Sequence, residues 1–476
     1  MLMRIGGEEV GSGSGAWLEV INPATGEVLD RVPAGGAEDV DAAVGAAEKA
    51  FGGWSAKSPR DRGKILFHVA LAVRAVHRDL ARTLTREQGK PLGEAVDEVR
   101  GCANVLEFYG SISGCLSGDF IRLGAAGDGI VVREPLGVCG AIIPWNMPVI
   151  LMGWKAGPAL LAGNTLLLKP SSTTPLTTLA IAGILEKAGL PPGVLNIVTG
   201  TGDTAGRAIV AHPGIRKVSF TGNTATGLAV REAAAPSMKE VTLELGGSDP
   251  MIVWKDAPLP AAVEGAVRGR FYNAGQVCNA VKRVYVHEEI AARFTEELLA
   301  RVRSLRVGDG LSPSVDMGPL QNPAQLDRVA AQVDRLRDRA EGRLLAGGSR
   351  LRGPEHDRGF FYAPTLVTGL EPGAGILNEE VFGPVLPIME VPDLDTAIRE
   401  ANRSRYGLGA SVWTRDLGVA RAVFDRVQAG VIWVNKHLTV PPEIPFGGVK
   451  ESGLGRENGV QAISEWTRAK SLFLGW

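Results

Sequence analysis

The chain has few cysteines and no marked excess of charge of either sign. Its 476 residues include four cysteines, Cys102, Cys115, Cys139 and Cys278. They are too few for a disulfide framework and show no metal-ligand spacing, so we expect no metal and a reducing, cytoplasmic compartment. Lys and Arg number 51 against 52 Asp and Glu, a net charge of -1. This balance, without a long basic run, argues against nucleic acid or an anionic membrane as a partner.

Long hydrophobic runs are also scarce, and only one needs a check. Segment 135–154 contains no charged residue, but Pro144, Asn146 and Pro148 interrupt it. A membrane-spanning helix tolerates such a cluster poorly. The first fifteen residues lack the apolar core of a signal peptide. We therefore expect neither a membrane segment nor a secretion signal.

Length and apolar spacing predict a multidomain globular protein that begins with helices. A chain of 476 residues with 45% hydrophobic and 22% charged residues is expected to form two or three domains. Apolar residues recur at helical spacing over 40–54 and again over 66–84. Gly89 and Pro91 are expected to end the second helix.

From Val131 onwards, strand-like segments alternate with helix-length ones. The predicted strands cover 165–169, 194–198, 217–220, 241–245 and 251–254. Between the first two, Thr174 is expected to cap a helix that has Pro175 in its first turn. A second α/β region follows, with a helix over 291–307 and a strand over 430–435. The alternation predicts mostly parallel, doubly wound α/β sheets.

Cys278 is the first candidate for chemistry. Gly275, Gln276 and Asn279 flank it and favour close backbone approach and polar contacts. A thiolate at this position can trap a carbonyl carbon covalently. The alternative is inert packing, which is common for a lone cysteine. The other three cysteines lack such neighbours and are interpreted as structural.

Two further residues have side chains suited to the same chemistry. Glu244 ends a predicted apolar strand before Gly246 and Gly247, where partial desolvation raises a carboxylate pKa toward that of a general base. Asn146 lies between two prolines and offers an amide donor for an oxyanion. The alternatives are an ordinary strand-end glutamate and a turn asparagine.

Glycine-rich segments give several candidates for a dinucleotide site. Gly200–Gly206 and Gly453–Gly459 nearly match the dinucleotide fingerprint, but each has one residue too many before its last glycine. Phe220–Gly227 is the better candidate because it follows a predicted strand and opens a helix. The free N–H groups at such a helix start can hold a pyrophosphate.

Four separate motifs resemble those of the aldehyde dehydrogenase superfamily. They are Pro144-Trp145-Asn146, Leu243–Gly247, Asn273–Ala280 and Glu380–Pro384, and the resemblance extends from about Ile21 to the C-terminus. It implies a non-acylating, NAD(P)-dependent enzyme that oxidises an aldehyde to the carboxylic acid through a cysteine thiohemiacetal and a thioester.

The resemblance also implies catalytic roles. Cys278 is the nucleophile, Glu244 activates the deacylating water, and Asn146 with the Cys278 N–H holds the oxyanion. Lys155 and Glu457 match a pair that relays protons, although a plain salt bridge is an equal alternative.

The implied cofactor is NAD or NADP. Lys169 matches a ribose-binding lysine, and Glu380 resembles the glutamate that holds the nicotinamide ribose. Ser172 stands where NAD-specific members usually have a glutamate that repels a 2′-phosphate, so NADP should be accepted. Asn223 replaces a serine of the family pattern. The full expected set is Trp145, Lys169, Ser171, Ser172, Gly202, Phe220, Thr221, Gly222, Asn223, Thr224, Gly227, Leu245, Gly246, Glu380 and Phe382.

By the same resemblance, mostly apolar residues line the substrate tunnel: Met147, Leu151, Trp154, Val277, Asn279, Val440 and Phe446. This predicts an uncharged aliphatic or aromatic aldehyde. Succinic semialdehyde dehydrogenases commonly place an arginine at the position of Trp154, and a betaine aldehyde would need an aromatic cage, of which Trp154 supplies one wall. Semialdehyde, betaine aldehyde and coenzyme A-acylating activities remain alternatives, as does a non-catalytic binding protein of the same fold.

The resemblance implies two Rossmann-like α/β domains and a small β flap. The expected bounds are 1–115 with 136–246 for cofactor binding, 247–451 for catalysis, 116–135 with 467–476 for the flap, and 452–466 as a connecting segment. The run 120–133 predicts a hairpin around Gly124–Gly129. Because an exposed hairpin edge needs a partner, we expect a homodimer or homotetramer.

Overall fold

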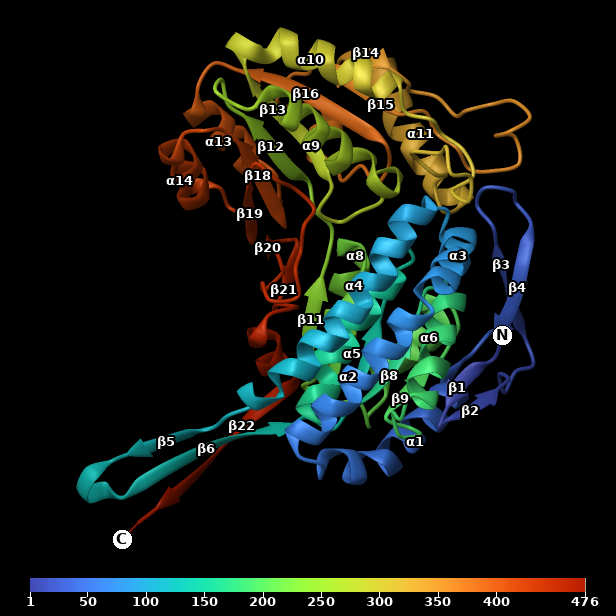
Figure 1. The fold of residues 1–476 in the computed structure, drawn as a ribbon, viewed down its shortest axis with the longest axis vertical. Coiled ribbons are helices and arrows are strands. Elements are labelled where there is room, and N and C mark those ends of the chain that lie inside the picture. The colour runs from blue at the N-terminus through green and yellow to red at the C-terminus, as the bar shows by residue number, and fades with distance from the viewer. Residues whose placement is uncertain (476) are drawn as a thin grey trace.

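The computed structural model describes residues 1–475 and has two α/β lobes with a β arm that extends from the first (Figure 1). In the first lobe an eight-stranded sheet has the order β2-β1-β9-β8-β7-β10-β11-β21. Its strands are β1 (Met3–Ile5), β2 (Glu8–Val10), β7 (Val138–Ile142), β8 (Thr165–Lys169), β9 (Leu195–Ile197), β10 (Lys217–Thr221), β11 (Glu240–Glu244) and β21 (Gly453–Leu454).

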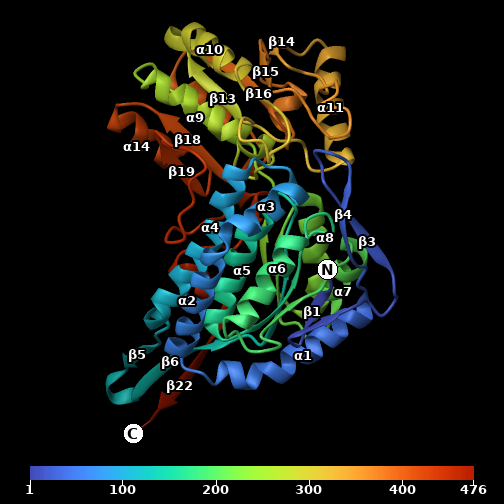
Figure 2. The same cartoon turned by 45° about the vertical axis from the view of Figure 1, so that its right-hand side comes forward.

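The five central strands of this sheet, from β9 to β11, are parallel. Helices surround the sheet in both views (Figures 1 and 2). They are α1 (Ala37–Ser55), α2 (Pro59–Ala75), α3 (His77–Gln88), α4 (Leu92–Ser111), α5 (Pro148–Ala162), α6 (Leu176–Lys187), α7 (Arg207–Ala211) and α8 (Thr224–Ala234). The chain reverses direction through the sheet at β7, and ligands of doubly wound folds bind at the carboxyl ends of strands beside such a point.

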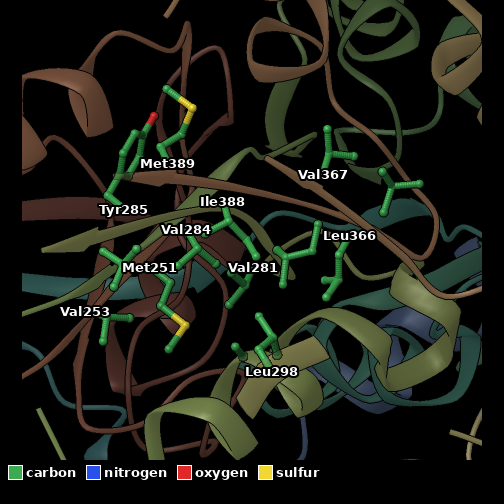
Figure 3. Packing of buried hydrophobic residues seen from close by; sticks show 14 of the residues in the cluster. Met251, Val253, Val281, Val284, Tyr285, Leu298, Leu366, Val367, Ile388 and Met389 are labelled. Atoms are coloured by element: carbon green, nitrogen blue, oxygen red, sulfur yellow. The ribbon is translucent and has the colours of Figure 1, made fainter. Parts of the chain in front are cut away.

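The second lobe has a seven-stranded sheet in the order β14-β15-β16-β13-β12-β18-β19, parallel except for β14. Its strands are β12 (Asp249–Val253), β13 (Val281–His287), β14 (Arg343–Ala346), β15 (Thr365–Thr368), β16 (Val385–Val391), β18 (Gly409–Trp413) and β19 (Val431–Val434). Its helices are α9 (Leu259–Phe271), α10 (Glu288–Arg303), α11 (Pro323–Asp338), α12 (Gly375–Asn378), α13 (Leu394–Asn402) and α14 (Leu417–Arg426). Val281, Val284 and Ile388 belong to the core between sheet and helices (Figure 3).

Three small sheets complete the fold. β3 (Trp17–Ile21) pairs with β4 (Val28–Pro33), and β17 (Tyr406–Gly407) pairs with β20 (Val449–Lys450). In the arm, β6 (Asp128–Pro135) pairs on one side with β5 (Asp119–Arg122) and on the other with β22 (Thr467–Leu474). The predicted hairpin is therefore present. Trp476, the last residue of the expected flap, lies outside the described residues.

The predicted α/β class with mostly parallel sheets is confirmed, but two local predictions are wrong. The continuous helix expected over 66–84 is two helices, α2 and α3, because Val76 leaves helical geometry at φ −114° and ψ 20°. Apolar spacing continues across this break because each helix buries its own apolar residues, although Val76 itself is exposed. The apolar spacing therefore indicates which residues are buried, and it does not show that the helix is continuous.

The second wrong prediction concerns the start of α6. Pro175, not Thr174, is the N-cap, and no side chain of the cap residue takes part. The buried carboxylate of Glu87 on α3 instead accepts the N–H groups of Leu176 and Thr177, at 2.7 and 2.9 Å. A remote carboxylate can replace a local cap because it offers the same acceptor atoms to the helix start.

Within residues 1–475, none of the helices combines the length and the apolar character that crossing a membrane requires.

Candidate active site

A pocket of about 760 Å³ lies between the two lobes and is lined by residues of both. Cys278 and Asn146 lie in its wall, although they are 132 positions apart in the chain. Asn146 follows β7 at the point where the sheet order reverses, and Cys278 precedes β13 of the second lobe. The two candidate groups for carbonyl chemistry therefore meet where the lobes face each other.

The loop before Cys278 has an unusual backbone that is held from several sides. Asn273 and Ala274 have φ values of 50° and 53°, in the left-handed region. The Gln276 side chain donates to the Asn273 carbonyl at 3.0 Å and accepts the N–H of Gln321 at 2.9 Å. These bonds offset the backbone strain and place Cys278 half-buried at the pocket wall.

Asn146 is anchored through both its side chain and its main chain. Its Nδ2 donates to the Gln276 carbonyl at 3.0 Å. Its own carbonyl accepts from Lys90 Nζ at 2.8 Å and from Asn273 Nδ2 at 2.9 Å. An amide held in this way is a preorganised donor for a negative charge that forms beside Cys278.

The environment of Cys278 favours the neutral thiol. Burial raises its pKa to about 12, and the carboxylates of Glu244, Asp249 and Glu380 act in the same direction. Lys282 is the cation that lowers this pKa. Formation of the reactive thiolate therefore depends on positive charge close to the sulfur.

Glu244 occupies a buried space behind the pocket wall, and its neighbours Leu245 and Gly246 line the pocket. Neither carboxylate oxygen has a hydrogen-bond partner among residues 1–475. Desolvation, followed by the charge of Glu457, holds the pKa of Glu244 well above its usual range. A buried carboxylate with a raised pKa can act as a general base once it reaches its substrate.

The two glycines after Glu244 let three parts of the site approach one another. A Cβ on Gly246 would lie 2.4 Å from Glu380 Oε2, and a Cβ on Gly247 would lie 2.7 Å from the Cys278 carbonyl oxygen. Neither distance is possible for a side chain. The Gly247 N–H donates to Glu380 Oε1 at 3.0 Å. Glycine at position 247 therefore lets the backbone at Cys278 pack against the segment that follows β11, and glycine at position 246 leaves room for the Glu380 carboxylate.

The candidate cofactor groove begins at α8. The Asn223 side chain caps this helix by accepting the Thr226 N–H at 2.9 Å. Lys169 is buried and donates to the carbonyls of Pro170 and Gly200 at 2.8 and 3.0 Å, and burial lowers its pKa to about 8. Trp145 and Phe382, which both line the pocket, meet edge-to-face with ring centroids 5.5 Å apart. Hydroxyl, amine and helix N–H donors thus line one side of the pocket.

Comparison with known proteins agrees with this geometry. The model of the aldehyde dehydrogenase family matches residues 10–472. The chain belongs to the aldehyde dehydrogenase family. Betaine aldehyde dehydrogenase from Brucella anthropi is 40% identical over 474 residues, which cover 99% of this chain and 96% of the relative.

Two solved structures of the same fold are similar over the whole chain. PnpE in complex with nicotinamide adenine dinucleotide has 38% identity and a TM-score of 0.98, covering 100% of this chain and 97% of the other. An NADP dependent enzyme of E. coli has 37% identity and a TM-score of 0.97, covering 100% and 98%.

Most residues singled out from the sequence line the pocket of this family member. Of the residues expected to bind the cofactor, the pocket wall contains Trp145, Lys169, Ser171, Ser172, Gly202, Phe220, Thr221, Gly222, Asn223, Leu245, Gly246, Glu380 and Phe382. Of those expected to line the substrate tunnel, it contains Met147, Leu151, Trp154, Val277, Asn279 and Val440. The sequence motifs therefore converge on one cavity.

Six expected site residues lie outside the pocket wall: Glu244, Lys155, Glu457, Thr224, Gly227 and Phe446. Lys155 is a buried residue of α5. Its Nζ contacts Glu457 Oε1 at 2.5 Å and Ser219 Oγ at 2.9 Å. Gly227 faces Leu245, where a Cβ would come within 2.3 Å of the leucine side chain. Phe446 packs behind Trp154, with ring centroids 5.1 Å apart. These residues support the pocket from behind.

Several residues that hold the site in this family member were missed from the sequence. Lys90, two residues before α4, and Glu94 and Glu98 within it are spaced four residues apart. Lys90 binds the Asn146 carbonyl, Glu94 accepts the Asn273 N–H at 2.8 Å, and Glu98 accepts the Val149 N–H at 2.8 Å. The four-residue spacing of charges was visible in the sequence, but such a stripe is usually solvated.

Two buried side chains beside the nucleophile were also missed, Lys282 and His437. His437 Nε2 contacts the Asn279 carbonyl at 2.8 Å and its Nδ1 contacts Ser411 Oγ at 2.9 Å. Burial lowers the pKa of His437 to about 4, so the ring is neutral. No sequence pattern distinguishes these residues from ordinary polar positions.

Proposed function

We propose that this chain oxidises an aldehyde to the carboxylic acid, with NAD or NADP as hydride acceptor. The observation that carries the proposal is the placement of Cys278 and Asn146 in one pocket with the nucleotide-side residues. Family membership supports it, as do the two similar structures whose names give NAD and NADP.

The donor set of the pocket fits a nicotinamide dinucleotide. The start of α8 offers backbone N–H groups for a pyrophosphate. Lys169, Ser171 and Ser172 offer donors for ribose hydroxyls, and Glu380 at the Cys278 end offers an acceptor for a second ribose. When bound, the cofactor accepts the hydride that the substrate carbon releases.

Covalent capture is the first step that the residues of the chain perform. Cys278 Sγ, as the thiolate, adds to the aldehyde carbon, and the carbonyl oxygen becomes an anion. Asn146 Nδ2 and the Cys278 N–H donate to this oxyanion. Loss of hydride from the resulting thiohemiacetal leaves an acyl group on Cys278 as a thioester.

Hydrolysis of the thioester is assigned to Glu244. Rotation about its side-chain bonds brings the carboxylate from behind Leu245 into the pocket, where it takes a proton from water. That water attacks the thioester carbon, releases the acid and restores Cys278. Lys155 and Glu457 lie next to the resting position of Glu244 and provide a route by which its proton leaves.

An uncharged aliphatic or aromatic aldehyde fits the substrate tunnel best. Met147, Leu151, Val277 and Val440 present apolar atoms, and Trp154 gives an aromatic wall. Betaine aldehyde is the second candidate, because an indole face attracts a quaternary ammonium and the Brucella anthropi relative carries that activity in its name. For the cofactor, the neutral Ser172 lacks the charge that would repel a 2′-phosphate, so both NAD and NADP should serve.

The same proposal covers modules, assembly and location. We assign 1–115 with 136–246 to cofactor binding, 247–451 to catalysis, and 116–135 with 467–476 to oligomerisation. The arm exposes Phe120 and Phe473, which supports a homodimer or homotetramer. All four cysteines are unpaired, which supports a reducing cytoplasm.

Replacement of the nucleophile tests the proposed function. Cys278→Ala should lower kcat with hexanal by at least about 1,000-fold, because the covalent step is lost. Cys115→Ala, at an exposed cysteine outside the pocket wall, is the matched control and should keep parental turnover. The measurement is reduced nicotinamide formation with NAD and with NADP, on hexanal, benzaldehyde, betaine aldehyde and succinic semialdehyde.

Two results would contradict this proposal. Near-parental turnover by Cys278→Ala would remove the nucleophile from the scheme. A coenzyme A thioester in place of the free acid as product would assign the chain to the acylating branch. A rate with succinic semialdehyde far above those with hexanal and benzaldehyde would overturn the substrate class alone.

A further inference from the structure

Lys282 is a buried cation directly beneath the nucleophile loop. It is the second residue of β13, and its side chain is 2% exposed. Its Nζ donates to the carbonyl oxygens of Val277 and Cys278, at 3.0 and 2.5 Å. It also lies 3.3 Å from Glu380 Oε1. The ammonium group therefore joins the nucleophile loop to the glutamate at the nicotinamide end of the pocket.

The first of these contacts, together with a hydrogen bond from the Ala280 N–H to the same Val277 oxygen at 3.1 Å, fixes the direction of the Cys278 N–H. The Val277 carbonyl and the Cys278 N–H belong to one peptide group, and all described peptide bonds are trans. In a trans peptide the C=O and N–H bonds point in opposite directions. Binding of the carbonyl oxygen by Lys282 therefore turns the N–H away from the ammonium. Within residues 1–475 this N–H has no hydrogen-bond partner, which leaves it free for an oxyanion.

The second effect of Lys282 is electrostatic. A cation on the oxygen of a peptide polarises that peptide and makes its N–H a stronger donor. The same charge opposes the carboxylates of Glu244, Asp249 and Glu380, which all raise the pKa of the Cys278 thiol. Both effects act at the sulfur and at the oxyanion position, where negative charge develops during the reaction.

We propose that Lys282 is a positioning residue that orients and polarises the Val277–Cys278 peptide and stabilises negative charge at the Cys278 sulfur. The proposal rests on the function proposed above, in which Cys278 is the nucleophile and its N–H holds the oxyanion. The alternative is a purely structural ion pair with Glu380, which would affect folding but not the reactivity of the thiol.

Alkylation of Cys278 by iodoacetamide, without cofactor, separates these possibilities. The background is Cys115→Ser, because Cys115 is exposed and would also react, whereas Cys102 and Cys139 are buried. The variants are Lys282→Met, Lys282→Gln and Lys282→Arg, with Lys255→Met at an exposed lysine as matched control. Circular dichroism and Tm establish that each variant is folded, and the alkylation rate constant is measured from pH 6 to pH 10.

The expected result follows from the thiolate fraction. Loss of the cation should lower the alkylation rate constant of Lys282→Met and Lys282→Gln at pH 8 by about 10-fold, the effect of one pKa unit. Lys282→Arg, which keeps the charge, should stay within about 3-fold of the parent on the same scale. If the bulkier arginine prevents Lys282→Arg from folding, Lys282→Gln still tests the effect of the charge. Glutamine removes the charge but retains an amide donor.

Steady-state kinetics test the oxyanion part. With hexanal, kcat/KM of Lys282→Gln should fall by about 10-fold or more, a smaller loss than removal of an oxyanion donor outright. KM for the nicotinamide cofactor should change less. The proposal would be overturned if folded Lys282→Met and Lys282→Gln kept the parental alkylation rate. It would also be overturned if the arginine and glutamine variants lost equal amounts of alkylation rate or kcat/KM. If the parent oxidised no aldehyde, the proposed function would fail while the alkylation rates still reported on Lys282.

Discussion

At the scale of single residues, Glu244 shows how burial sets both chemistry and stability. Its carboxylate is 3% exposed and no described residue donates a hydrogen bond to it. An unpaired charge in such a place is costly, so the protonated form is favoured. In the function proposed above, Glu244 acts as a base after a change of position, and its proton leaves through Lys155 and Glu457.

This environment predicts a specific pH dependence of stability. The folded-state pKa of Glu244 lies above its unfolded value, so folding retains a proton that the unfolded chain releases. The stabilising contribution is therefore complete below the unfolded pKa of about 4.5 and is lost as the pH rises through the folded pKa. Glu244→Gln is neutral throughout, so its free energy of unfolding relative to the parent should increase by about 1–3 kcal/mol between pH 5 and pH 8.

Urea unfolding at the two pH values checks this expectation. Glu297→Gln, on the surface of α10 in an i,i+4 pair with Arg293, is the control and should shift by less than about 0.5 kcal/mol. A relative stability of Glu244→Gln that stays constant or declines with rising pH would contradict the raised pKa.

At the scale of elements, α5 depends on a charged partner from another helix. Fourteen of its 15 residues are buried, so its first N–H groups cannot reach water. Glu98 on α4 accepts the N–H groups of Val149 and Ile150 at 2.8 and 3.3 Å. Lys90 in turn pairs with Glu98, and both side chains are fully buried. The start of α5 carries Asn146 and Met147, so this cap also sets one wall of the pocket.

Removal of one partner of this pair should be far more damaging than removal of both. Glu98→Ala leaves Lys90 as an uncompensated buried charge and should lower the free energy of unfolding by about 3–5 kcal/mol. The double variant Lys90→Met with Glu98→Ala should recover part of that loss. A double-mutant cycle by chemical denaturation measures the coupling.

The partly exposed pair of Arg74 with Glu107, on α2 and α4, provides the control for this cycle. Its coupling should stay below about 1 kcal/mol. If the two couplings turned out alike, burial would not be what makes the Lys90–Glu98 pair strong.

At the scale of the whole molecule, the arm presents an apolar face that its own chain does not cover. Phe120, Ile130 and Leu472 lie in register across β5, β6 and β22, so their side chains share one face of the small sheet. Phe120 and Leu472 are 60% and 53% exposed. The arm projects away from both lobes (Figure 1), which makes intramolecular burial of this face impossible without refolding.

A charge on that face should therefore change the assembly state and leave the protomer intact. Leu472→Glu should lower the mass measured by light scattering toward that of one 50.1 kDa chain, while the far-UV circular dichroism stays the same. Leu417→Glu, at an 84% exposed position on α14, is the matched control and should not change the mass. An unaltered mass for Leu472→Glu would remove the arm from the assembly interface.

The sequence by itself determined the fold class, the family and the segments that meet at the pocket. Local context alone left structural alternatives open for Cys278 and Asn146, and the resemblance of their motifs to those of a known family assigned their roles. The predicted helix boundaries were wrong where packing overrides local preference, at Val76 and at the start of α6.

Tertiary structure alone decided where the side chains point and what balances their charges. Glu244 is adjacent to Leu245 in sequence, yet only Leu245 lines the pocket, and the Glu244 side chain is buried behind the pocket wall. Lys90, Glu98 and Lys282 became recognisable as supports of the site only when helices and loops from distant parts of the chain enclosed them. Burial and hydrogen bonding depend on every segment that packs around a group, and this information is absent from the residues next to it.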